Sequence, residues 1–496
     1  MNSDFKKNTG ILIILIFFYS IGLIQLSQCR HIDGDEGYYA SSVGLVAEGK
    51  TVYSDFIYPQ APLLPYIYSI VHFIKASLAS LRIFSALLSV LMVSLWGVFL
   101  LKQYPHTPAV LFMAMLLLIL DPYLASWNVV VKTYVLSNFF ITLILLLLFF
   151  AFRTDRKRYY ILSGICCSLL ISIRALYGPV VFVILGFLFL RDLFEVNRNI
   201  KASFRFIAGL AAGSIPLIYF FIINPKGFIF NNITYHAIRS YTPGLKAHFF
   251  YAGKFFLQTI FHCPYLLLII GLSLTGLLFS RKPEKLFSFR FLLFIISGIF
   301  IISSSYPFPL FEQYYLAALA PFLFPFVSSG VSVIHRHIHK FAWLLLFIAI
   351  LISIKEVQKE SFRHPQNSVW TLKTYQSVSQ YIVQNTKPDD IVLSFWTGYI
   401  YESGRQYLPK FESHTGIRIS PKLSDKQRSD YRIISNKEIF SAIKNKVPSA
   451  VITGVWMRQF HKNLSEHEYE QFYRSLDNNY KLSKQIDTAF IYLRRE

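Results

Sequence analysis

The chain has 496 residues, of which 54% are hydrophobic, and it carries a formal net charge of +22 at pH 7. Its mean hydropathy of +0.44 excludes a soluble globular protein of this length, and runs such as 139–152 and 341–354 contain no charged residue. The basic residues are spread through short loops with no nucleic-acid-binding motif, which argues against a nucleic-acid partner and favours a role in membrane orientation.

A membrane-spanning helix needs about 20 apolar residues, and the sequence predicts a polytopic α-helical membrane protein with about eleven such helices. They are predicted at 11–29, 81–101, 108–124, 133–152, 159–176, 179–195, 206–223, 255–280, 291–305, 314–334 and 341–354. Because basic loops lie on the cytoplasmic side, we expect a cytoplasmic N-terminus and an extracytoplasmic C-terminus in the inner or plasma membrane. The first span could instead be a cleaved signal peptide, but Ser27-Gln-Cys29 is a poor cleavage site, which favours a retained anchor.

The first outer loop, residues 30–80, contains the closely spaced carboxylates of Asp33, Asp35 and Glu36. Carboxylates at a membrane are costly and usually have a chemical role there. A short surface helix is predicted from Asp35 to Gly49, and its dipole favours the ionised carboxylate that a catalytic base needs. The alternative is that these acids only cap the helix.

Two further regions are expected outside the membrane. Segment 59–76 is apolar and aromatic, and we interpret it as an interfacial helix on the outer surface. The chain is then divided into a transmembrane domain, 1–354, and a small soluble α/β domain, 355–496. Within the latter we expect a helix at 369–384, strands at 391–395, 450–455 and 488–493, and capping boxes that begin at Ser435 and Ser465.

The motif Asp35-Glu36-Gly-Tyr-Tyr39, followed by Tyr58-Pro-Gln-Ala-Pro62, resembles the glycosyltransferase C superfamily. It is most similar to the protein O-mannosyltransferase and lipid A aminoarabinose transferase families and their bacterial relatives, which use a sugar carried on a polyprenyl phosphate. The resemblance implies that Asp35 is the base for the acceptor and that Glu36 supports it, or that Asp33 is the base if the motif alignment shifts. It also implies substrate or lipid contacts at Tyr38, Tyr39, Tyr58, Gln60, Tyr314 and Tyr315.

Two features depart from these families. Pro59 and Gln60 stand where the aminoarabinose transferases have Glu-Lys, and Val131-Lys-Thr-Tyr134 lacks the acid that many relatives carry in the second outer loop. A divalent metal is therefore unsupported and no cofactor is firmly implied. The cluster His335-Arg-His-Ile-His339 has metal-like spacing but falls in a cytoplasmic basic loop of the predicted topology.

A polyprenyl phosphate leaving group develops negative charge, which fixed cations stabilise. The candidates on the predicted outer side are Arg174, Lys132, Arg82 and Arg239. The alternative for each is that the side chain extends to lipid head groups.

The sequence therefore predicts a membrane glycosyltransferase that moves a sugar from a polyprenyl-phosphate donor to a lipid, glycan or protein acceptor on the outer face, with inversion. One alternative is a lipid or glycan transporter or flippase without chemistry, although the predicted spans hold few polar residues. Another is a wall-polymer ligase that uses lipid diphosphate donors, for which His236 and His248 are the candidate residues.

Overall fold

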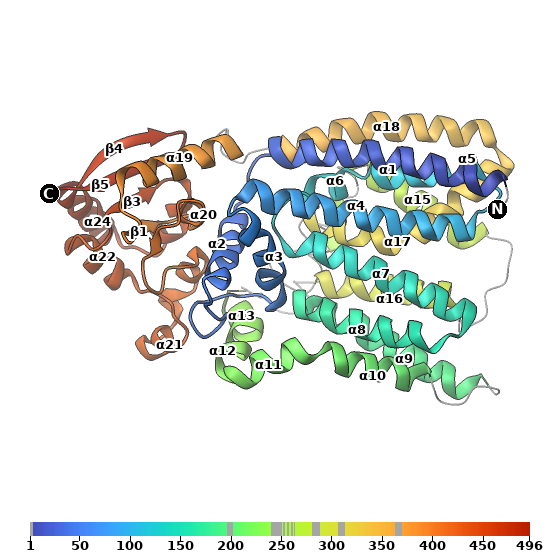
Figure 1. The fold of residues 1–496 in the computed structure, drawn as a ribbon, viewed down its shortest axis with the longest axis horizontal. Helices are drawn as coiled ribbons and strands as arrows, with labels where there is room; N and C mark the ends of the chain where they lie inside the picture. The colour runs from blue at the N-terminus through green and yellow to red at the C-terminus, as the bar shows by residue number, and fades with distance from the viewer. Residues whose placement is uncertain are drawn as a thin grey trace.

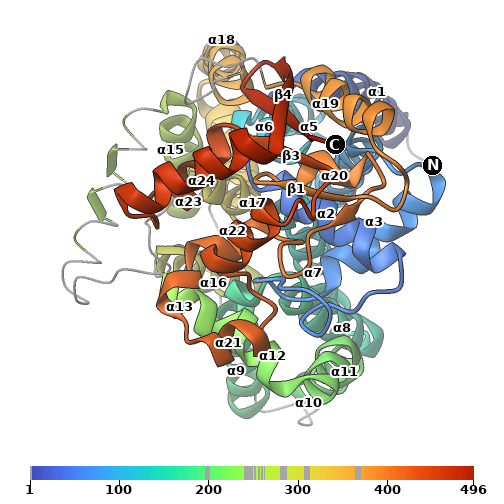
Figure 2. The same ribbon diagram turned by 90° about the vertical axis from the view of Figure 1, so that its left-hand side faces the viewer.

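The computed structural model describes residues 3–195, 202–239, 263–279, 288–305, 313–362 and 370–496, together with a few positions between 250 and 261. A bundle of long helices forms one end of the elongated molecule, and a smaller unit that contains the β-sheet forms the other (Figure 1). Helices α2 (Glu36–Ala47) and α3 (Leu63–Ile74) lie between the bundle and this sheet unit (Figure 1). Figure 2 looks onto the sheet unit with the bundle behind it.

The bundle is built from the apolar segments of the sequence. Its helices are α1 (Ser3–Cys29), α4 (Leu78–Gln103), α5 (Pro108–Ile119), α6 (Pro122–Trp127), α7 (Thr133–Thr154), α8 (Lys157–Ile173), α9 (Gly178–Phe194), α10 (Ala202–Gly213), α11 (Ile215–Ile223), α15 (Pro264–Phe279), α16 (Phe289–Ser305), α17 (Gln313–His337) and α18 (His339–Phe362). By length and composition, six helices among the described residues could cross a membrane, or seven if the bent pair α10 and α11 is one span. A described helix overlaps each predicted span, but the count of eleven is not confirmed.

Two of the predicted spans are interrupted for clear chemical reasons. Helix α5 ends before Asp121, whose side chain accepts hydrogen bonds from the backbone N–H groups of Tyr123 and Leu124 and so starts the new helix α6. Helices α10 and α11 meet at an angle of 44°, where Pro216 lacks the N–H that a continuous helix needs.

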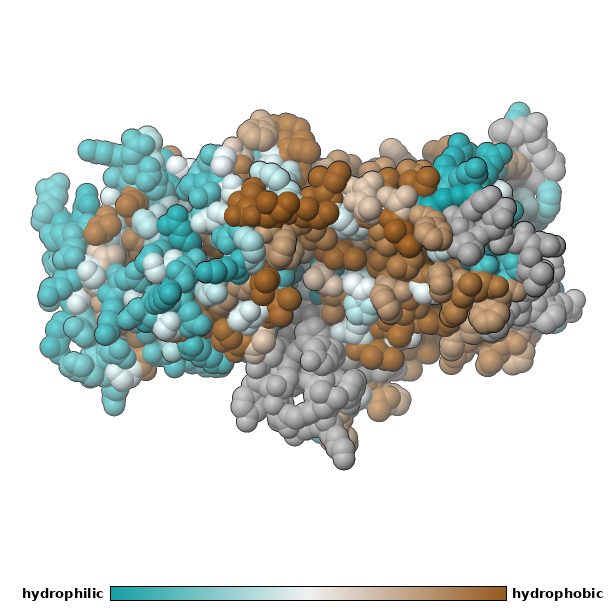
Figure 3. All heavy atoms as spheres, turned by 90° about the horizontal axis from the view of Figure 1, so that it is seen from below, coloured by the Kyte–Doolittle hydropathy of each residue, from teal (hydrophilic) through white to brown (hydrophobic). Residues whose placement is uncertain are grey.

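The bundle carries an apolar surface belt. Large hydrophobic side chains such as Phe18, Phe182 and Phe204 are exposed on it, and Figure 3 shows hydrophobic residues along the bundle and hydrophilic residues over the sheet unit. So much apolar surface is unfavourable in water and suits contact with lipid. This distribution agrees with the prediction of a polytopic membrane protein.

The sheet unit consists of a five-stranded mixed sheet with order β2-β1-β3-β5-β4 and helices around it. Its main elements are α19 (Leu372–Asn385), β1 (Ile391–Ser394), α20 (Gly398–Tyr401), β2 (Gln406–Tyr407), α21 (Asp425–Asp430), α22 (Asn436–Lys444), β3 (Ala450–Thr453), α23 (Arg458–His461), α24 (Glu466–Asn479), β4 (Tyr480–Ile486) and β5 (Ala489–Arg494). The capping boxes at Ser435 and Ser465 are confirmed. Strand β4 was not predicted, because this edge strand is mostly exposed and polar.

Helix α2 corrects one expectation about the first outer loop. It occupies the predicted position, and Gly49 follows it with a φ of +88°. It is not a surface helix, however, because residues 36–45 are all buried. The sheet unit covers it, with Tyr401 close to Gly44 and Trp396 close to Gly37. Helix α3 lies within the predicted interfacial segment.

Candidate active site

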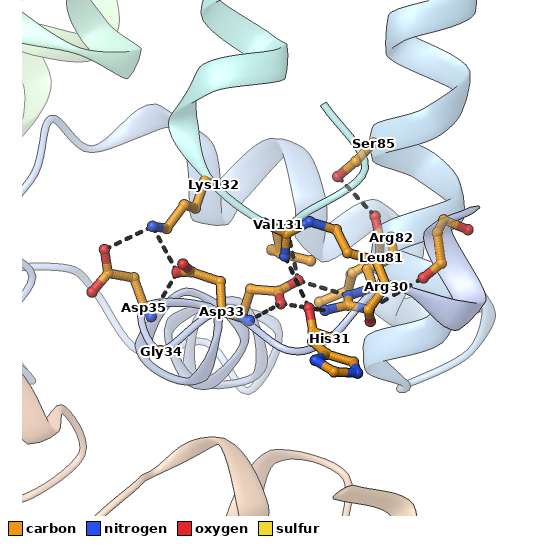
Figure 4. A network of polar contacts seen from close by, with 12 residues as sticks. Arg30, His31, Asp33, Gly34, Asp35, Leu81, Arg82, Ser85, Val131 and Lys132 are labelled. Atoms are coloured by element: carbon orange, nitrogen blue, oxygen red, sulfur yellow. Dashed lines mark hydrogen bonds and ion pairs between the residues drawn. The ribbon is translucent and has the colours of Figure 1, made fainter. Parts of the chain in front are cut away.

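The loop between α1 and α2 holds the three predicted carboxylates, and the first feature of this site is a fully buried ion pair (Figure 4). Glu36 Oε1 accepts from Arg82 Nε at 2.8 Å, and Glu36 Oε2 accepts from Arg82 Nη2 at 2.5 Å. Glu36 also accepts from the backbone N–H of Val131 at 3.0 Å and of Asp33 at 2.9 Å. One carboxylate thus connects α2, α4 and the segment that precedes α7.

Arg82 is equally well satisfied. Besides Glu36, it donates to the carbonyl oxygens of Ser27, Arg30 and His31. Its five N–H groups therefore all have acceptors, and burial of the charge is compensated by paired hydrogen bonds. Desolvation raises the pKa of Glu36, but the adjacent Arg82 outweighs it and holds that pKa below its ordinary value. These contacts assign Glu36 and Arg82 to holding the loop in place, and a phosphate at Arg82 would have to displace existing partners.

The second feature is a cation shared by two carboxylates at the head of α2. Lys132 Nζ lies 2.6 Å from Asp33 Oδ1 and 3.0 Å from Asp35 Oδ2 (Figure 4). Asp33 Oδ1 also accepts from the backbone N–H of Asp35 at 3.0 Å. Asp35 is the N-cap residue of α2, but its side chain makes no capping hydrogen bond. The alternative that the acids only cap the helix therefore does not describe Asp35, whereas Asp33 does stabilise the local turn.

Exposure and charge distinguish Asp35 from its neighbours. Its side chain is 52% exposed, whereas that of Lys132 is 3% exposed. Desolvation raises the pKa of Asp35, but Lys132 and then the more distant Arg239 and His414 hold it below its ordinary value. Desolvation lowers the pKa of Lys132, but Asp33 and Asp35 raise it well above its ordinary value. Asp35 is therefore an accessible carboxylate that is ionised at neutral pH.

Tyr134 links two of the predicted phosphate-binding cations. Arg174 lies over its ring at 4.5 Å from the guanidinium carbon, and Lys132 Nζ is 5.7 Å from the same ring centroid. Such contacts orient a cation without neutralising it. Arg239, at the end of α13 (Tyr235–Arg239), acts electrostatically on Asp35, and together with desolvation and Arg174 it lowers the pKa of His236 to about 4. Lys132 and Arg239 thus both act on Asp35, and Arg174 lies over the same Tyr134 ring as Lys132.

The aromatic residues predicted to contact substrate form a buried cluster. The ring centroids of Tyr38 and Tyr39 are 4.1 Å apart, and Tyr58 lies 6.2 and 6.3 Å from them. All three side chains are buried, and Tyr38 and Tyr39 interact electrostatically with Asp35. The carbonyl oxygen of Gln60 accepts from the hydroxyl of Tyr53. The side chains of Tyr314 and Tyr315, and residues Glu312 and His248, lie outside the described part of the chain.

The sheet unit adds residues that the sequence did not single out as site residues. His414 acts electrostatically on Asp35, its ring lies 6.2 Å from that of Tyr38, and its Nδ1 is 3.2 Å from the hydroxyl of Thr397. Trp456 lies against Gly34, where an added Cβ would come 2.0 Å from its ring. No local signal could have found His414 or Trp456, because each reaches the loop only through the tertiary fold. Among the described residues, no group of three or more His, Cys, Asp or Glu side chains could hold a metal ion.

No protein-family model and no curated protein matches this sequence. Among solved structures, the chain is similar to the arabinofuranosyltransferase AftD from Mycobacteria, with a TM-score of 0.50 and 11% sequence identity. The match covers 97% of this chain and 41% of that chain, so this chain spans less than half the length of that protein. At this identity the likeness shows the fold alone, and the specific O-mannosyltransferase and aminoarabinose transferase resemblance gains no support from the sequence comparisons. Over nearly its whole length the chain thus has a fold similar to that of part of a mycobacterial arabinofuranosyltransferase.

Proposed function

We propose that this protein is a membrane glycosyltransferase that moves a sugar from a polyprenyl-phosphate donor to an acceptor on the outer face of the membrane. The observation that carries the proposal is the accessible carboxylate of Asp35, paired with Lys132 at 3.0 Å and acted on by the cation of Arg239. A base next to fixed positive charge is what a reaction with a phosphate leaving group requires. The fold similarity to an arabinofuranosyltransferase supports the same reaction class.

In this reaction Asp35 accepts the proton of an acceptor hydroxyl or amine, and the freed electron pair forms a bond to the anomeric carbon of the sugar. The bond between that carbon and the phosphate oxygen breaks, and polyprenyl phosphate leaves with the electron pair. Attack from the face opposite the leaving group inverts the anomeric configuration. Lys132, Arg174 and Arg239 stabilise the developing phosphate charge.

The proposal gives the other predicted residues supporting roles. Glu36 and Arg82 hold the loop that carries Asp35, through the buried pair between α2 and α4. Tyr38, Tyr39 and Tyr58 form a buried aromatic cluster, of which Tyr38 and Tyr39 interact with Asp35. We further propose that residues 1–354 are the transmembrane domain and that 355–496 form an extracytoplasmic domain that closes over the site.

The test compares Asp35→Asn with Asp33→Asn in the full chain reconstituted into liposomes and supplied with a polyprenyl-phosphate sugar. Each variant removes the negative charge of one carboxylate that pairs with Lys132. Asn at position 33 keeps the side-chain oxygen that accepts a hydrogen bond from the backbone N–H of Asp35. We expect Asp35→Asn to abolish sugar transfer while donor binding persists, and Asp33→Asn to retain a substantial part of the wild-type rate.

The opposite pattern would make Asp33 the base. Full transfer by a correctly inserted Asp35→Asn variant would remove the proposed base altogether. Movement of intact donor across the bilayer without loss of its sugar would favour the transporter alternative. A requirement for a lipid diphosphate donor, together with loss of activity in His236→Gln, would favour the ligase alternative.

A further inference from the structure

Lys132 is held between two carboxylates and two aromatic rings. Its Nζ bridges Asp33 and Asp35, and its side chain is 3% exposed. The rings of Trp127 and Tyr134 flank it at 5.3 and 5.7 Å. The ammonium group of Lys132 is therefore held in a fixed position. An anion that approaches it must replace one of its two carboxylate partners.

The two carboxylates hold Lys132 unequally. Asp33 is closer, at 2.6 Å, and its side chain is 19% exposed. Asp35 is farther, at 3.0 Å, and its side chain is 52% exposed. Ion pairs with an exposed partner are weak, so the contact with Asp35 is the one that an incoming anion replaces more easily. Lys132 would keep Asp33 as its partner throughout.

We infer that Lys132 is exchanged between Asp35 and the phosphate of the donor, so that Asp35 is released as a base only after the donor has bound. The inference rests on the proposed function of Asp35 and names an order of binding within the same site. No covalent bond changes in this step. The phosphate takes the position of Asp35 Oδ2 at Lys132 Nζ, and Arg174 on the same Tyr134 ring offers it a second cation.

The chemistry of Asp35 supports this exchange. A carboxylate bound to an ammonium group is a poor base, because proton uptake would break the ion pair. Desolvation favours the protonated form of Asp35, and Lys132 is the largest influence that opposes it. When the phosphate draws Lys132 away from Asp35, the proton affinity of Asp35 therefore rises, and Asp35 can then take the proton of the acceptor. The other titratable groups that interact with Asp35 are Asp33, Arg239, His414, Tyr38, Tyr39 and Tyr235.

The exchange can be tested by binding alone, without sugar transfer. The probe is a polyprenyl phosphate without sugar, titrated into the full chain in nanodiscs. If Asp35 competes with phosphate for Lys132, then Asp35→Asn should tighten binding by about fivefold, as expected for loss of a weak ion pair. In a Lys132→Met background, which should itself bind more weakly, Asp35→Asn should change the affinity by less than about twofold.

Glu48→Gln is the matched control, because Glu48 lies in the same outer loop and forms its own exposed pair with Lys50 at 3.6 Å. It removes the same charge from the loop and should leave binding unchanged. If Lys132→Met fails to fold, Lys132→Gln takes its place in the cycle.

Unchanged or weaker binding by Asp35→Asn would overturn the exchange. Equal tightening in the presence and absence of Lys132 would also overturn it, because the effect would then be general loss of negative charge. Coupling in the binding cycle with unimpaired transfer by Asp35→Asn would uphold the competition for Lys132 while refuting the proposed base. The binding and transfer measurements therefore separate failure of this inference from failure of the proposed function.

Discussion

The indole Nε1 of Trp396 donates a hydrogen bond of 2.8 Å to the carbonyl oxygen of Gly34, across 362 positions of the chain. The contact joins the sheet unit to the loop that carries Asp33 and Asp35. Trp396 is 2% exposed and also packs on Gly37, so its position is fixed from several sides. The carboxylates at the head of α2 are therefore positioned by residues from both ends of the molecule.

Gly37→Ala tests whether Trp396 positions the loop. An added Cβ would lie 2.5 Å from the Trp396 ring, which is closer than real Cβ atoms approach. Because Trp396 is buried, either the ring or the loop must shift, and overpacking of this kind costs about 1–3 kcal/mol. We expect sugar transfer to fall by at least about tenfold, since small displacements of a reacting group cost a large part of the rate.

Gly186→Ala in α9 is the control, because nothing lies within 4 Å of the Cβ that it adds. Alanine is a better helix former than glycine, so this variant should keep full activity and unfold at an equal or higher temperature. Equal activity of the two variants would show that the contact between Trp396 and the loop does not position Asp35.

Glu36→Gln should lower the stability of the protein, although Glu36 is not proposed to contact the substrate. The change leaves the buried Arg82 charge uncompensated, which costs about 3 kcal/mol. Replacement of both partners, Glu36→Leu with Arg82→Met, should recover part of this loss because neither charge of the pair remains buried. The measurement is thermal unfolding in detergent, and a double variant that is less stable than Glu36→Gln would contradict the prediction.

The pH dependence of this stability has a definite sign. The folded-state pKa of Glu36 lies below the ordinary value of 4.5 because Arg82 outweighs desolvation. The stabilisation is therefore complete above pH 4.5 and is lost as the pH falls through the folded-state pKa. The difference in unfolding temperature between wild type and Glu36→Gln should be largest near pH 7 and should shrink below pH 4.5.

Local patterns predicted the long helices, strands β1, β3 and β5 and the capping boxes, because these depend on residues close together in the chain. The spacing of Ser435 and Glu438 was sufficient to place the start of α22. The interruption at Asp121 was not predicted, since hydropathy hides a single cap inside an apolar run. The burial of α2 was not predicted either, because part of its cover comes from Trp396 and Tyr401, which are more than 300 positions away.

The candidate site shows the same division. Residue type and position relative to the first spans made Asp35 and Lys132 candidate site residues. In the structure, Asp35 Oδ2 lies 3.0 Å from Lys132 Nζ. The family resemblance gave Glu36 a supporting role beside Asp35, but its partner Arg82 could not be predicted, because only the tertiary structure pairs the two side chains. His414 carried no sequence signal at all, since its place beside the loop depends on how the sheet unit packs.

His414 provides a second pH test, with a different origin. Desolvation lowers its pKa to about 4, against the opposing influence of Asp35. Between about pH 6.5 and 4 the unfolded chain therefore binds the proton more readily, so His414 makes the protein less stable as the pH falls through this range. His414→Gln should reduce this loss in the free energy of unfolding by up to about 3 kcal/mol at pH 4, and the measurement is the unfolding temperature from pH 4 to pH 7.

Arg174→Lys should weaken donor binding although the charge is kept. The guanidinium carbon lies over the Tyr134 ring at 4.5 Å, a contact that suits arginine, and lysine also loses the paired donors that match a phosphate. We expect the donor KM to rise about tenfold, or ~1.4 kcal/mol, with a smaller change in kcat.

Arg191→Lys is the matched control, since Arg191 lies over Phe152 at 4.1 Å and pairs with Glu195. Because Arg191 is placed away from the carboxylates, its replacement should leave the donor KM unchanged. A similar KM for both variants would show that Arg174 makes no contact with the donor phosphate, and the cation cluster would then consist of Lys132 and Arg239 alone.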